Sequence, residues 1–374
     1  MNDSEEQKFE VVHFITTLER GGAEKQLAYL VAEQIRQGLS VTVIYFKGTP
    51  ELEDFFLDLG VGIFPIKNIF KRDFVALGFK KLFYEKELIL HSHLPRAELF
   101  CLLISIISRR PFVTSRHNAE RFLPKSNKFL SKILSRYSTS RASTTIAISQ
   151  SVKNYLVSNG EINRNASIQV VYYGFSKDTY SRIEKFDIGY LNSKTNVTRK
   201  KLVTISRLEP QKNLFRLIDA VVPILATSNC ELLIYGEGSQ RVDLEKYIQK
   251  RRVQNRILIK GKTSDVTSVL KTADLFILAS LYEGFGMVLF EAMANNCRIA
   301  ASCVSAIPEV LGNNYPFLFN PIDVYDISSK IQSCLVDKSN FFTNFTNNQL
   351  QKFPINESHQ RIFAIYKKTH QIKR

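Results

Sequence analysis

The sequence lacks several features that mark common classes of protein. No apolar run approaches the roughly 18 residues that a membrane-spanning helix needs, and the longest, residues 99–107, fits a buried helix. The five cysteines show no Cys-x-x-Cys spacing, which argues against a disulfide framework or a zinc site and is typical of reduced thiols in a cytosolic protein. Residues 1–6 are acidic and carry no apolar segment, so a signal peptide is not predicted.

Two further patterns are missing. The glycine fingerprint Gly-x-Gly-x-x-Gly of dinucleotide-binding enzymes is absent, which disfavours a dehydrogenase. The six histidines are scattered, and only His91 and His93 lie close together. Two residues apart on a strand, these two would share a face, but no further ligand cluster is visible. The sequence therefore predicts no metal site.

The composition fits a large globular protein. The chain has 374 residues, 44% of them hydrophobic and 23% charged, which is enough for two domains with separate cores. The formal net charge is +16, and a balance this basic favours an anionic partner. Nucleic acid is one such partner, but no nucleic-acid-binding module is recognisable, so we predict none.

Short apolar runs alternate with helical stretches in two series, which predicts two α/β domains with parallel sheets and helices on both faces. We expect an N-terminal domain over residues 1–178, a polar linker over 179–200, a second domain over 201–355 and a C-terminal helix over 356–374. The expected strands lie at residues 10–15, 41–46, 87–91, 112–115, 145–148 and 168–171, and then at 202–206, 231–235, 256–260, 274–279 and 298–302.

The most informative segment is Glu283-Gly284-Phe285-Gly286-Met287-Val288-Leu289-Phe290-Glu291. Two carboxylates bracket a pair of glycines where an expected strand gives way to a helix. Glycine lets the backbone approach a ligand, and the N–H groups of a first helical turn form a site for phosphate. Glu291 follows Met287 by four residues and so lies on the same helix face, where its carboxylate can accept hydrogen bonds from a sugar diol.

Two other segments have a similar character. Residues 202–206 form an apolar strand followed by a loop in which Arg207 and Lys212 can converge on one anion. Near the N-terminus, Gly21 and Gly22 follow another expected strand and open an amphipathic helix, again a backbone cradle for an anion. Each of the three segments alone is weak evidence for a ligand site. Together they are strong evidence, because all three stand where an expected strand gives way to a helix or loop.

Together these segments resemble the GT-B glycosyltransferases, specifically the large retaining group known as family 4. The resemblance covers about residues 9–370. It implies two Rossmann-like doubly wound domains facing a cleft, with a C-terminal helix crossing back onto the first domain. This sequence departs from the family pattern at two places. Many relatives have other residues where this chain has Tyr172-Tyr173-Gly174-Phe175 and Asn296-Cys297-Arg298.

The resemblance assigns roles to the matching positions. It implies that Arg207 and Lys212 neutralise the donor diphosphate, that Glu283 holds hydroxyls of the donor sugar, and that His117 reaches the sugar near the reacting carbon. The donor-binding positions that it implies, many of them through backbone atoms, are Gly21, Gly22, Gly236, Thr263, Phe285, Gly286, Met287, Val288 and Glu291.

The chain contains no Asp-x-Asp pair, which metal-dependent nucleotide-sugar enzymes of another fold use to hold a cation. We therefore expect a UDP- or GDP-linked sugar donor and no metal or other cofactor. The resemblance implies retention of the anomeric configuration. We expect the leaving phosphate to take the acceptor's proton, so that neither glutamate acts as a nucleophile.

The first half also contains a basic amphipathic segment. From Arg121 to Arg141 there are six basic residues and no acidic residue. As a helix, this segment places Lys125, Lys128, Lys132 and Arg136 in one stripe beside Phe129, Leu130, Ile133, Leu134 and Tyr137. Such a helix suits an anionic membrane surface, although a solvated face is an equal alternative. Residues 70–72 and 79–84 interleave aromatic and basic side chains in the same half.

These features predict a cytoplasmic glycosyltransferase, peripheral on the inner face of the plasma membrane, that extends a lipid-linked glycan such as a polysaccharide or O-antigen precursor. A transferase acting on a protein or a soluble acceptor is the alternative, and vesicle binding would separate the two. A non-catalytic sugar-nucleotide-binding subunit is disfavoured because Arg207, Lys212, Glu283 and Glu291 are all present.

Overall fold

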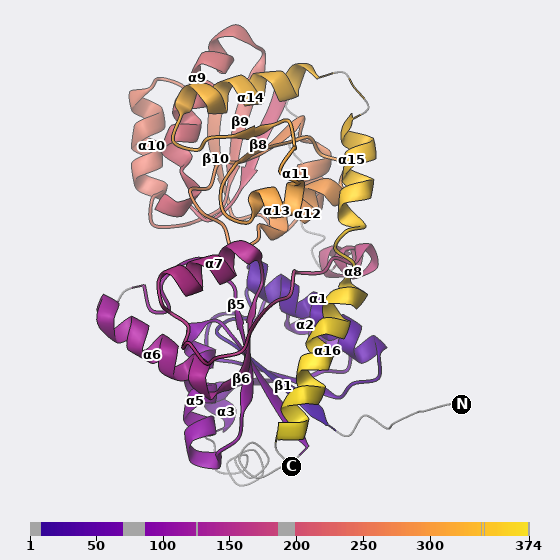
Figure 1. Cartoon of the computed structure of the whole chain (residues 1–374). Coiled ribbons are helices and arrows are strands. Elements are labelled where there is room, and N and C mark those ends of the chain that lie inside the picture. The colour runs from indigo at the N-terminus through magenta and orange to yellow at the C-terminus, as the bar shows by residue number, and fades with distance from the viewer. Residues whose placement is uncertain are drawn as a thin grey trace. The chain divides into compact units, whose positions relative to one another are not determined.

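The computed structural model describes residues 9–69, 87–124, 126–185, 199–337, 339 and 341–372 (Figure 1). The chain divides into two compact units. The first unit combines Met1–Ile183 with Phe353–Arg374, and the second unit is Glu184–Lys352. Residues 70–72 and 79–84, Lys125 and most of the predicted linker, residues 186–198, lie outside the described residues.

The first unit is built on a seven-stranded parallel sheet with the order β3-β2-β1-β4-β5-β6-β7. Its strands are β1 (Glu10–Ile15), β2 (Val41–Tyr45), β3 (Gly62–Pro65), β4 (Leu88–His93), β5 (Phe112–Arg116), β6 (Ala142–Ala147) and β7 (Ile168–Val170). Its described helices are α1 (Gly22–Arg36), α2 (Glu53–Asp58), α3 (Ile66–Ile69), α5 (Pro95–Ser108), α6 (Lys128–Arg141), α7 (Gln150–Ser158), α8 (Lys177–Lys185) and α16 (Ile355–Ile372). The last helix returns from the end of the chain to pack beside α1 and against β4, β5 and β6.

The second unit has a six-stranded parallel sheet with the order β10-β9-β8-β11-β12-β13. The strands are β8 (Lys200–Ile205), β9 (Cys230–Tyr235), β10 (Ile257–Gly261), β11 (Leu275–Leu278), β12 (Ile299–Ser302) and β13 (Leu318–Phe319). The helical segments are η1 (Pro210–Lys212), α9 (Leu214–Thr227), α10 (Arg241–Lys250), α11 (Val266–Lys271), α12 (Met287–Ala294), α13 (Ile307–Leu311), α14 (Val324–Val336) and α15 (Phe341–Leu350).

Both sheets reverse their strand order at one point, between β1 and β4 in the first unit and between β8 and β11 in the second. The predicted α/β class with two Rossmann-like doubly wound units is therefore confirmed. In open sheets of this kind, ligands bind outside the carboxyl ends of the strands at the reversal point. This rule directs attention to the loops that follow these four strands.

The central strands are apolar because helices cover both of their faces. β11 and β12 are buried at every position. β4 is also buried throughout, yet it contains His91, Ser92 and His93. Polar side chains are rarely placed in a fully buried strand unless they are hydrogen-bonded or functional. The buried polar residues at the end of β4 therefore mark this strand end as a candidate for function.

Candidate active site

The predicted cation and carboxylate meet in the second unit. Lys212, at the end of η1 after β8, places its Nζ 2.6 Å from Oε2 of Glu283, which follows β11. The hydroxyl of Ser280 donates to the same carboxylate oxygen over 3.2 Å. Two residues 71 positions apart are therefore in contact at the carboxyl ends of β8 and β11, where the strand order reverses.

Arg207 lies exposed on the same β8 loop, and its Nη2 donates to Oε1 of Gln211 over 3.2 Å. Gln211 also joins the two loops, because its Nε2 donates to the carbonyl of Tyr282 and its own carbonyl accepts from Leu281 N. No local pattern singles out Gln211, since its role depends on a loop far away in the chain. Gln211 holds the strand-end loops together while leaving the Arg207 guanidinium near the surface.

Glycine is required where the loop after β9 meets the loop after β8. Gly236 has a φ of 143°, and a Cβ there would lie 1.8 Å from the carbonyl oxygen of Ser206. Nearby, Leu208 N donates to the carbonyl of Glu237 over 2.9 Å. The predicted donor-side position Gly236 thus lets two backbone segments pass at a distance that no side chain permits. Thr263, after β10, accepts a hydrogen bond from Asp265 N and begins the turn into α11.

The glycine-rich turn before α12 forms as the sequence predicts. Gly286 is the N-cap, with a φ of 87°, and α12 begins at Met287. No side chain caps this end, and the N–H groups of a first helical turn, here those of Met287 and Val288, have no partner within the helix. One turn further, Glu291 is buried at 4% exposure. The Phe285 ring packs against Phe290, so Phe285 can offer a ligand only its backbone.

In the first unit, the predicted Gly-Gly turn also begins a helix. Gly21 is the extended N-cap of α1, and a Cβ on it would lie 2.3 Å from Oε2 of Glu24. Gly22 is exposed at the first helical position. The turn follows β1 and lies at the carboxyl edge of the sheet, at the reversal point between β1 and β4.

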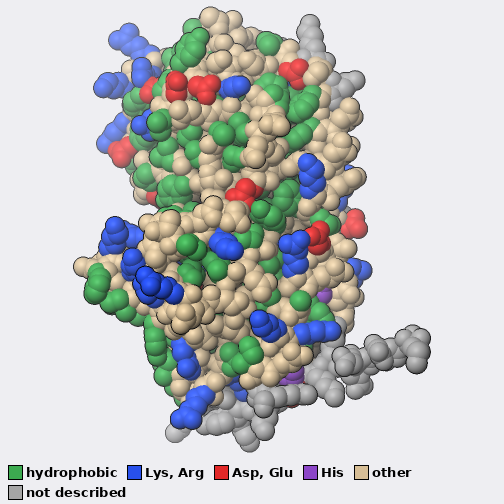
Figure 2. All heavy atoms as spheres, in the orientation of Figure 1, with side chains coloured by type: hydrophobic (Ala, Val, Ile, Leu, Met, Phe, Trp, Pro, Cys, Tyr) green, Lys and Arg blue, Asp and Glu red, His purple; other side chains and the backbone are tan. Residues whose placement is uncertain are grey.

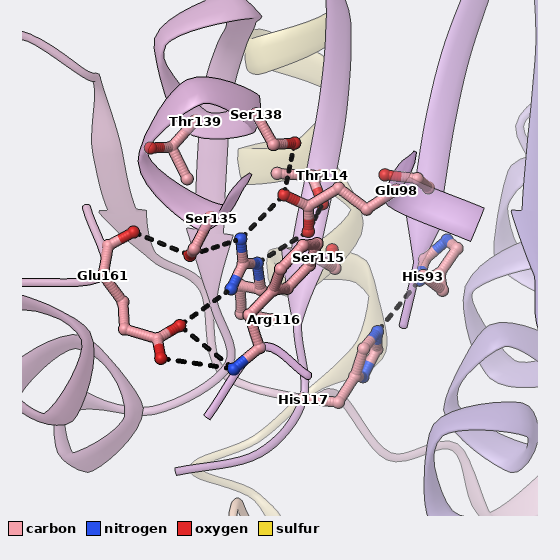
Figure 3. A network of polar contacts seen from close by, with 12 residues as sticks. His93, Glu98, Thr114, Ser115, Arg116, His117, Ser135, Ser138, Thr139 and Glu161 are labelled. Carbon is pink, nitrogen blue, oxygen red and sulfur yellow. Dashed lines mark hydrogen bonds and ion pairs between the residues drawn. The ribbon is translucent and has the colours of Figure 1, made fainter. Parts of the chain in front are cut away.

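His117 follows β5 and is buried at 7% exposure. Both of its ring nitrogens are engaged, with Nε2 3.2 Å from Nδ1 of His93 and Nδ1 bonded to the Tyr173 hydroxyl. Tyr173 lies in the segment where the sequence departs from many relatives, and the structure makes it the partner of the predicted site histidine. His93 and His117 are drawn together in Figure 3.

The structure adds a third histidine to the pair His91 and His93. His13 on β1 is the register partner of His91, and the ligand atoms of the three residues lie within 4.8 Å of one another. Sequence reasoning missed His13 because the adjacency of β1 and β4 is not visible in the chain order. The ring nitrogens are occupied by hydrogen bonds, since His13 Nδ1 lies 3.0 Å from His93 Nε2 and His91 bonds to Tyr366 and Ser115.

Burial keeps these histidines neutral. It lowers the pKa of His13 to about 4 and the pKa of His117 to about 3. The pKa values of His91 and His93 are also well below the usual value, first through burial and then through the neighbouring imidazoles. The unfolded chain binds protons on these side chains below about pH 6.5, and the folded chain does not.

We therefore expect the protein to lose stability as the pH falls from 6.5 to 5. In this window the unfolded state binds more protons, and each buried histidine contributes a slope of up to about 1.4 kcal/mol per pH unit. Urea unfolding at pH 7.5, 6.5, 5.7 and 5.0 measures this slope before most carboxylates titrate. A free energy of unfolding that stays constant across these four values would contradict the burial of four neutral imidazoles.

A second buried network holds the end of β5 on the opposite face of the sheet (Figure 3). The guanidinium of Arg116 donates from Nη2 to Glu98 Oε1 over 2.7 Å, and its Nε lies 2.6 Å from Glu98 Oε2. Glu161 approaches from the other side, with Oε2 3.8 Å from Arg116 Nη1. A charge this deeply buried needs such partners, and the pair fixes the strand end from which His117 departs.

The same network turns helix α6 so that its small polar face points inward. Ser131, Ser135, Ser138 and Thr139 are buried at helical spacing. Ser135 Oγ donates to the carbonyl of Glu161 over 2.7 Å, and Ser138 Oγ donates to Glu98 Oε1 over 2.6 Å. The apolar face therefore points outward, with Phe129 at 73%, Leu130 at 50%, Ile133 at 46% and Tyr137 at 49% exposure.

The predicted helix over residues 121–141 is wrong at its start. In the structure α6 begins at Lys128, because Asn127 caps it and accepts hydrogen bonds from Phe129 N and Leu130 N. Lys128 is exposed, and Lys132 and Arg136 are half-buried on the same helix. Lysine and arginine side chains gather beside apolar ones over α6 on the face seen in Figure 2. Within the described ranges, each helix is too short or too polar to span a bilayer.

The chain matches two family models, one in each half. Residues 20–178 match the model described as Glycosyltransferase Family 4, and residues 192–352 match the one described as Glycosyl transferases group 1. The second match contains the Lys212–Glu283 pair and the turn before α12. The first contains Gly21, Gly22 and His117.

Curated relatives are similar over parts of their length. N-acetyl-alpha-D-glucosaminyl L-malate synthase of Bacillus anthracis is 27% identical over 60% of this chain and 58% of its own. The GPI3 subunit of the phosphatidylinositol N-acetylglucosaminyltransferase of Saccharomyces cerevisiae is 32% identical over 36% of this chain and 31% of its own. The capsular polysaccharide biosynthesis glycosyltransferase CapM of Staphylococcus aureus is 26% identical, over 68% and 69%. This chain thus spans less than two thirds of the first two relatives.

Solved structures share the fold over nearly the whole chain. The structure of Anabaena HepE in complex with UDP and glucose has a TM-score of 0.77 at 20% identity and covers 96% of this chain and 100% of its own. A mutant of S. aureus TarM has a TM-score of 0.70 at 11% identity, again over 96% and 100%. At these identities the likeness concerns the fold alone.

Proposed function

The chain belongs to the group 1 glycosyltransferases with the GT-B fold, and from this premise we propose a retaining enzyme that moves a sugar from a nucleoside-diphosphate donor to a hydroxyl of a glycan. The observation that carries the proposal is the contact between Lys212 and Glu283 at the carboxyl ends of β8 and β11, beside the uncapped N-terminus of α12. A cation, helix N–H groups and a sugar-binding carboxylate are thereby gathered at the strand reversal.

The proposed catalysis is electrostatic. A nucleoside diphosphate is a poor leaving group until its charge is neutralised, and groups fixed in advance where charge develops are the most effective. Lys212 is held in place by Glu283, and Arg207, on the same loop, is bonded to Gln211. The N–H groups at the start of α12 add a favourable field for phosphate. Together these groups replace the cation that an Asp-x-Asp pair would hold, so no metal is required.

The family resemblance implies retention, and we propose that it proceeds through departure of an ion pair. As the bond between the anomeric carbon and the phosphate oxygen breaks, the acceptor hydroxyl attacks the same face, and its proton passes to the departing phosphate oxygen. No enzyme carboxylate forms a bond to the sugar, in contrast to retaining glycosidases. We assign Glu283 to the donor-sugar hydroxyls, Glu291 to the ribose diol, and the backbone around Phe285, Gly286, Met287 and Val288 to phosphate and sugar oxygens.

We assign the remaining donor contacts from the family resemblance, unit by unit. In the second, Gly236 and Thr263 flank the nucleotide. In the first, Gly21 and Gly22 approach the diphosphate and His117 meets the donor sugar. HepE was solved with UDP and glucose, and we therefore place UDP-linked donors first in the screen, with GDP-linked donors as the alternative.

A thermal-shift screen with UDP- and GDP-linked sugars tests this proposal. A tight ligand stabilises the folded state by mass action, by about 2.7 kcal/mol at 100 times its dissociation constant. The melting temperature rises as a result. We expect a shift with one donor class, and we expect it to survive EDTA because cationic side chains and helix amides hold the diphosphate. A shift abolished by EDTA and restored by Mg²⁺ would contradict the metal-free site, and no shift with any sugar nucleotide would contradict the donor class.

For the acceptor, we favour a lipid-linked glycan at the inner face of the plasma membrane, as in the synthesis of polysaccharide, lipopolysaccharide or O-antigen precursors. The support comes from α6, whose inner face is fixed by Ser135, Ser138 and the Arg116 network while Phe129 and Ile133 point outward. Exposed apolar side chains next to basic ones match the boundary of an anionic membrane. A protein or soluble acceptor becomes the better reading if the protein does not bind such membranes.

A further inference from the structure

A continuous chain of buried hydrogen bonds runs from α1 to the predicted site histidine. Gln34 Oε1 lies 2.9 Å from His13 Nε2, His13 Nδ1 lies 3.0 Å from His93 Nε2, and His93 Nδ1 lies 3.2 Å from His117 Nε2. Gln34 and His13 are fully buried and His93 nearly so. Four residues from α1, β1, β4 and the end of β5 thus form one line of contacts inside the first unit.

The line has a direction because each neutral imidazole has one N–H and one acceptor nitrogen. The carbonyl oxygen of Gln34 only accepts, so the proton of His13 is on Nε2 and its Nδ1 accepts from His93 Nε2. By the same rule His93 Nδ1 accepts from His117 Nε2. The Nδ1 of His117 is then left as an acceptor, and it receives the hydrogen bond of the Tyr173 hydroxyl.

A second branch is consistent with this orientation of the Gln34 amide. Its Nε2 donates to the Tyr366 hydroxyl of α16 over 3.3 Å, and that hydroxyl lies 2.7 Å from His91 Nδ1. His91 Nε2 in turn lies 2.8 Å from Ser115 Oγ. If Tyr366 donates to His91, then His91 donates to Ser115, and every group in both branches is satisfied with one proton per imidazole. Reversing one tautomer would set two donors, or two acceptors, against each other.

We propose that Gln34, His13 and His93 are positioning residues that fix which ring nitrogen of His117 carries the proton. The proposal rests on the proposed function, in which His117 meets the donor sugar. Fixing Nε2–H toward His93 makes Nδ1 an acceptor, so a ligand hydroxyl that replaces the Tyr173 hydroxyl finds an acceptor already oriented. The C-terminal helix takes part through Tyr366, although it lies far from His117 in sequence.

Nitrogen NMR of histidine-labelled protein reads the tautomers directly, and it needs no substrate. We expect Nε2–H in His13, His93 and His117 of the wild-type protein. Gln34→Glu keeps an acceptor for His13 and should leave the His117 tautomer unchanged. Gln34→Leu removes the acceptor, and although it lies three hydrogen bonds from His117, it should populate the Nδ1–H form of His117. A change confined to packing would not move this signal.

Turnover with the donor identified by the screen supplies a second readout. At metal sites, removing a group that hydrogen-bonds to the second ring nitrogen of a histidine lowers affinity or activity by about 10–100-fold. We expect a loss of similar size in kcat for Gln34→Leu, with the kcat of Gln34→Glu near wild type. Mixed tautomers in the wild-type protein would overturn the proposal, and this measurement does not depend on any variant folding. An unchanged His117 signal in folded Gln34→Leu would also overturn the proposal. Failure of the donor screen with intact tautomer coupling would count against the proposed function alone.

Discussion

Replacing Arg207 or Lys212 by alanine is expected to lower kcat by about 10²–10³-fold under saturating donor, since each replacement removes a preorganised charge from the leaving diphosphate. The two side chains lie on one loop after β8, and Lys212 is in contact with Glu283 across the reversal point of the sheet. Single-turnover rates with the identified sugar nucleotide measure the loss. Lys212→Arg should retain more activity than Lys212→Ala because it keeps the positive charge, although a planar guanidinium replaces the compact ammonium group.

The matched control is Arg251→Ala. Arg251 is the C-cap residue of α10 in the same unit, and its exposed side chain pairs with the partly exposed Asp219. Such a pair contributes about 0–1 kcal/mol, so the control should fold and turn over like the wild type. Melting temperatures of all variants separate loss of charge from loss of fold. Near-wild-type turnover in both Arg207→Ala and Lys212→Ala would remove the basis for the proposed leaving-group stabilisation.

The second unit was largely predictable from sequence because its signals are local. Arg207 and Lys212 lie five positions apart after one apolar strand, and the Gly286 turn directly precedes α12. The contact between Lys212 and Glu283 needed the fold, because the two residues are 71 positions apart. Gln211, which bonds to both loops, has no local signal of this kind.

In the first unit the decisive contacts are non-local. His13 and His93 are 80 positions apart, and Gln34 and Tyr366 are 332 positions apart. Their meeting depends on strand order and on the return of α16, neither of which a pattern along the chain reveals. The family resemblance selected His117 as a site residue, but nothing in its sequence neighbourhood shows that both of its ring nitrogens are engaged within the unit.

Helix α6 shows a different limit. Its sequence predicts an amphipathic helix with a basic stripe beside an apolar stripe, but it does not show which face of the helix is buried. Hydrophobicity alone would turn Phe129 and Ile133 inward. The buried Arg116 needs Glu98 and hydroxyl partners, and it selects the serine face instead. An interior ion pair thereby determines what the surface of the protein displays.

This arrangement leads to the prediction about membranes. Changing Lys128, Lys132 and Arg136 together to glutamate should lower partitioning onto anionic vesicles by at least about 100-fold at low salt, since each basic residue near such a surface is worth about 1 kcal/mol. Flotation with vesicles rich in anionic lipid, compared with neutral vesicles, measures the change. Donor-induced thermal shifts should stay intact, because none of these three α6 residues is among those that we assign to the donor.

Net charge alone could produce part of this effect, so the control must carry the same change elsewhere. Replacing the exposed Lys246, Lys250 and Lys271 of the second unit by glutamate alters the charge equally and leaves α6 unchanged. If α6 is the docking surface, this control keeps most of its vesicle binding, whereas Phe129→Ser with Ile133→Ser loses binding without any change in charge. Salt should weaken the electrostatic part, because the Debye length shortens to about 8 Å at 0.15 M, but not the apolar part. If the wild-type protein floats no better with anionic than with neutral vesicles, the outward apolar face of α6 serves another partner, and a soluble acceptor becomes the better account of the enzyme.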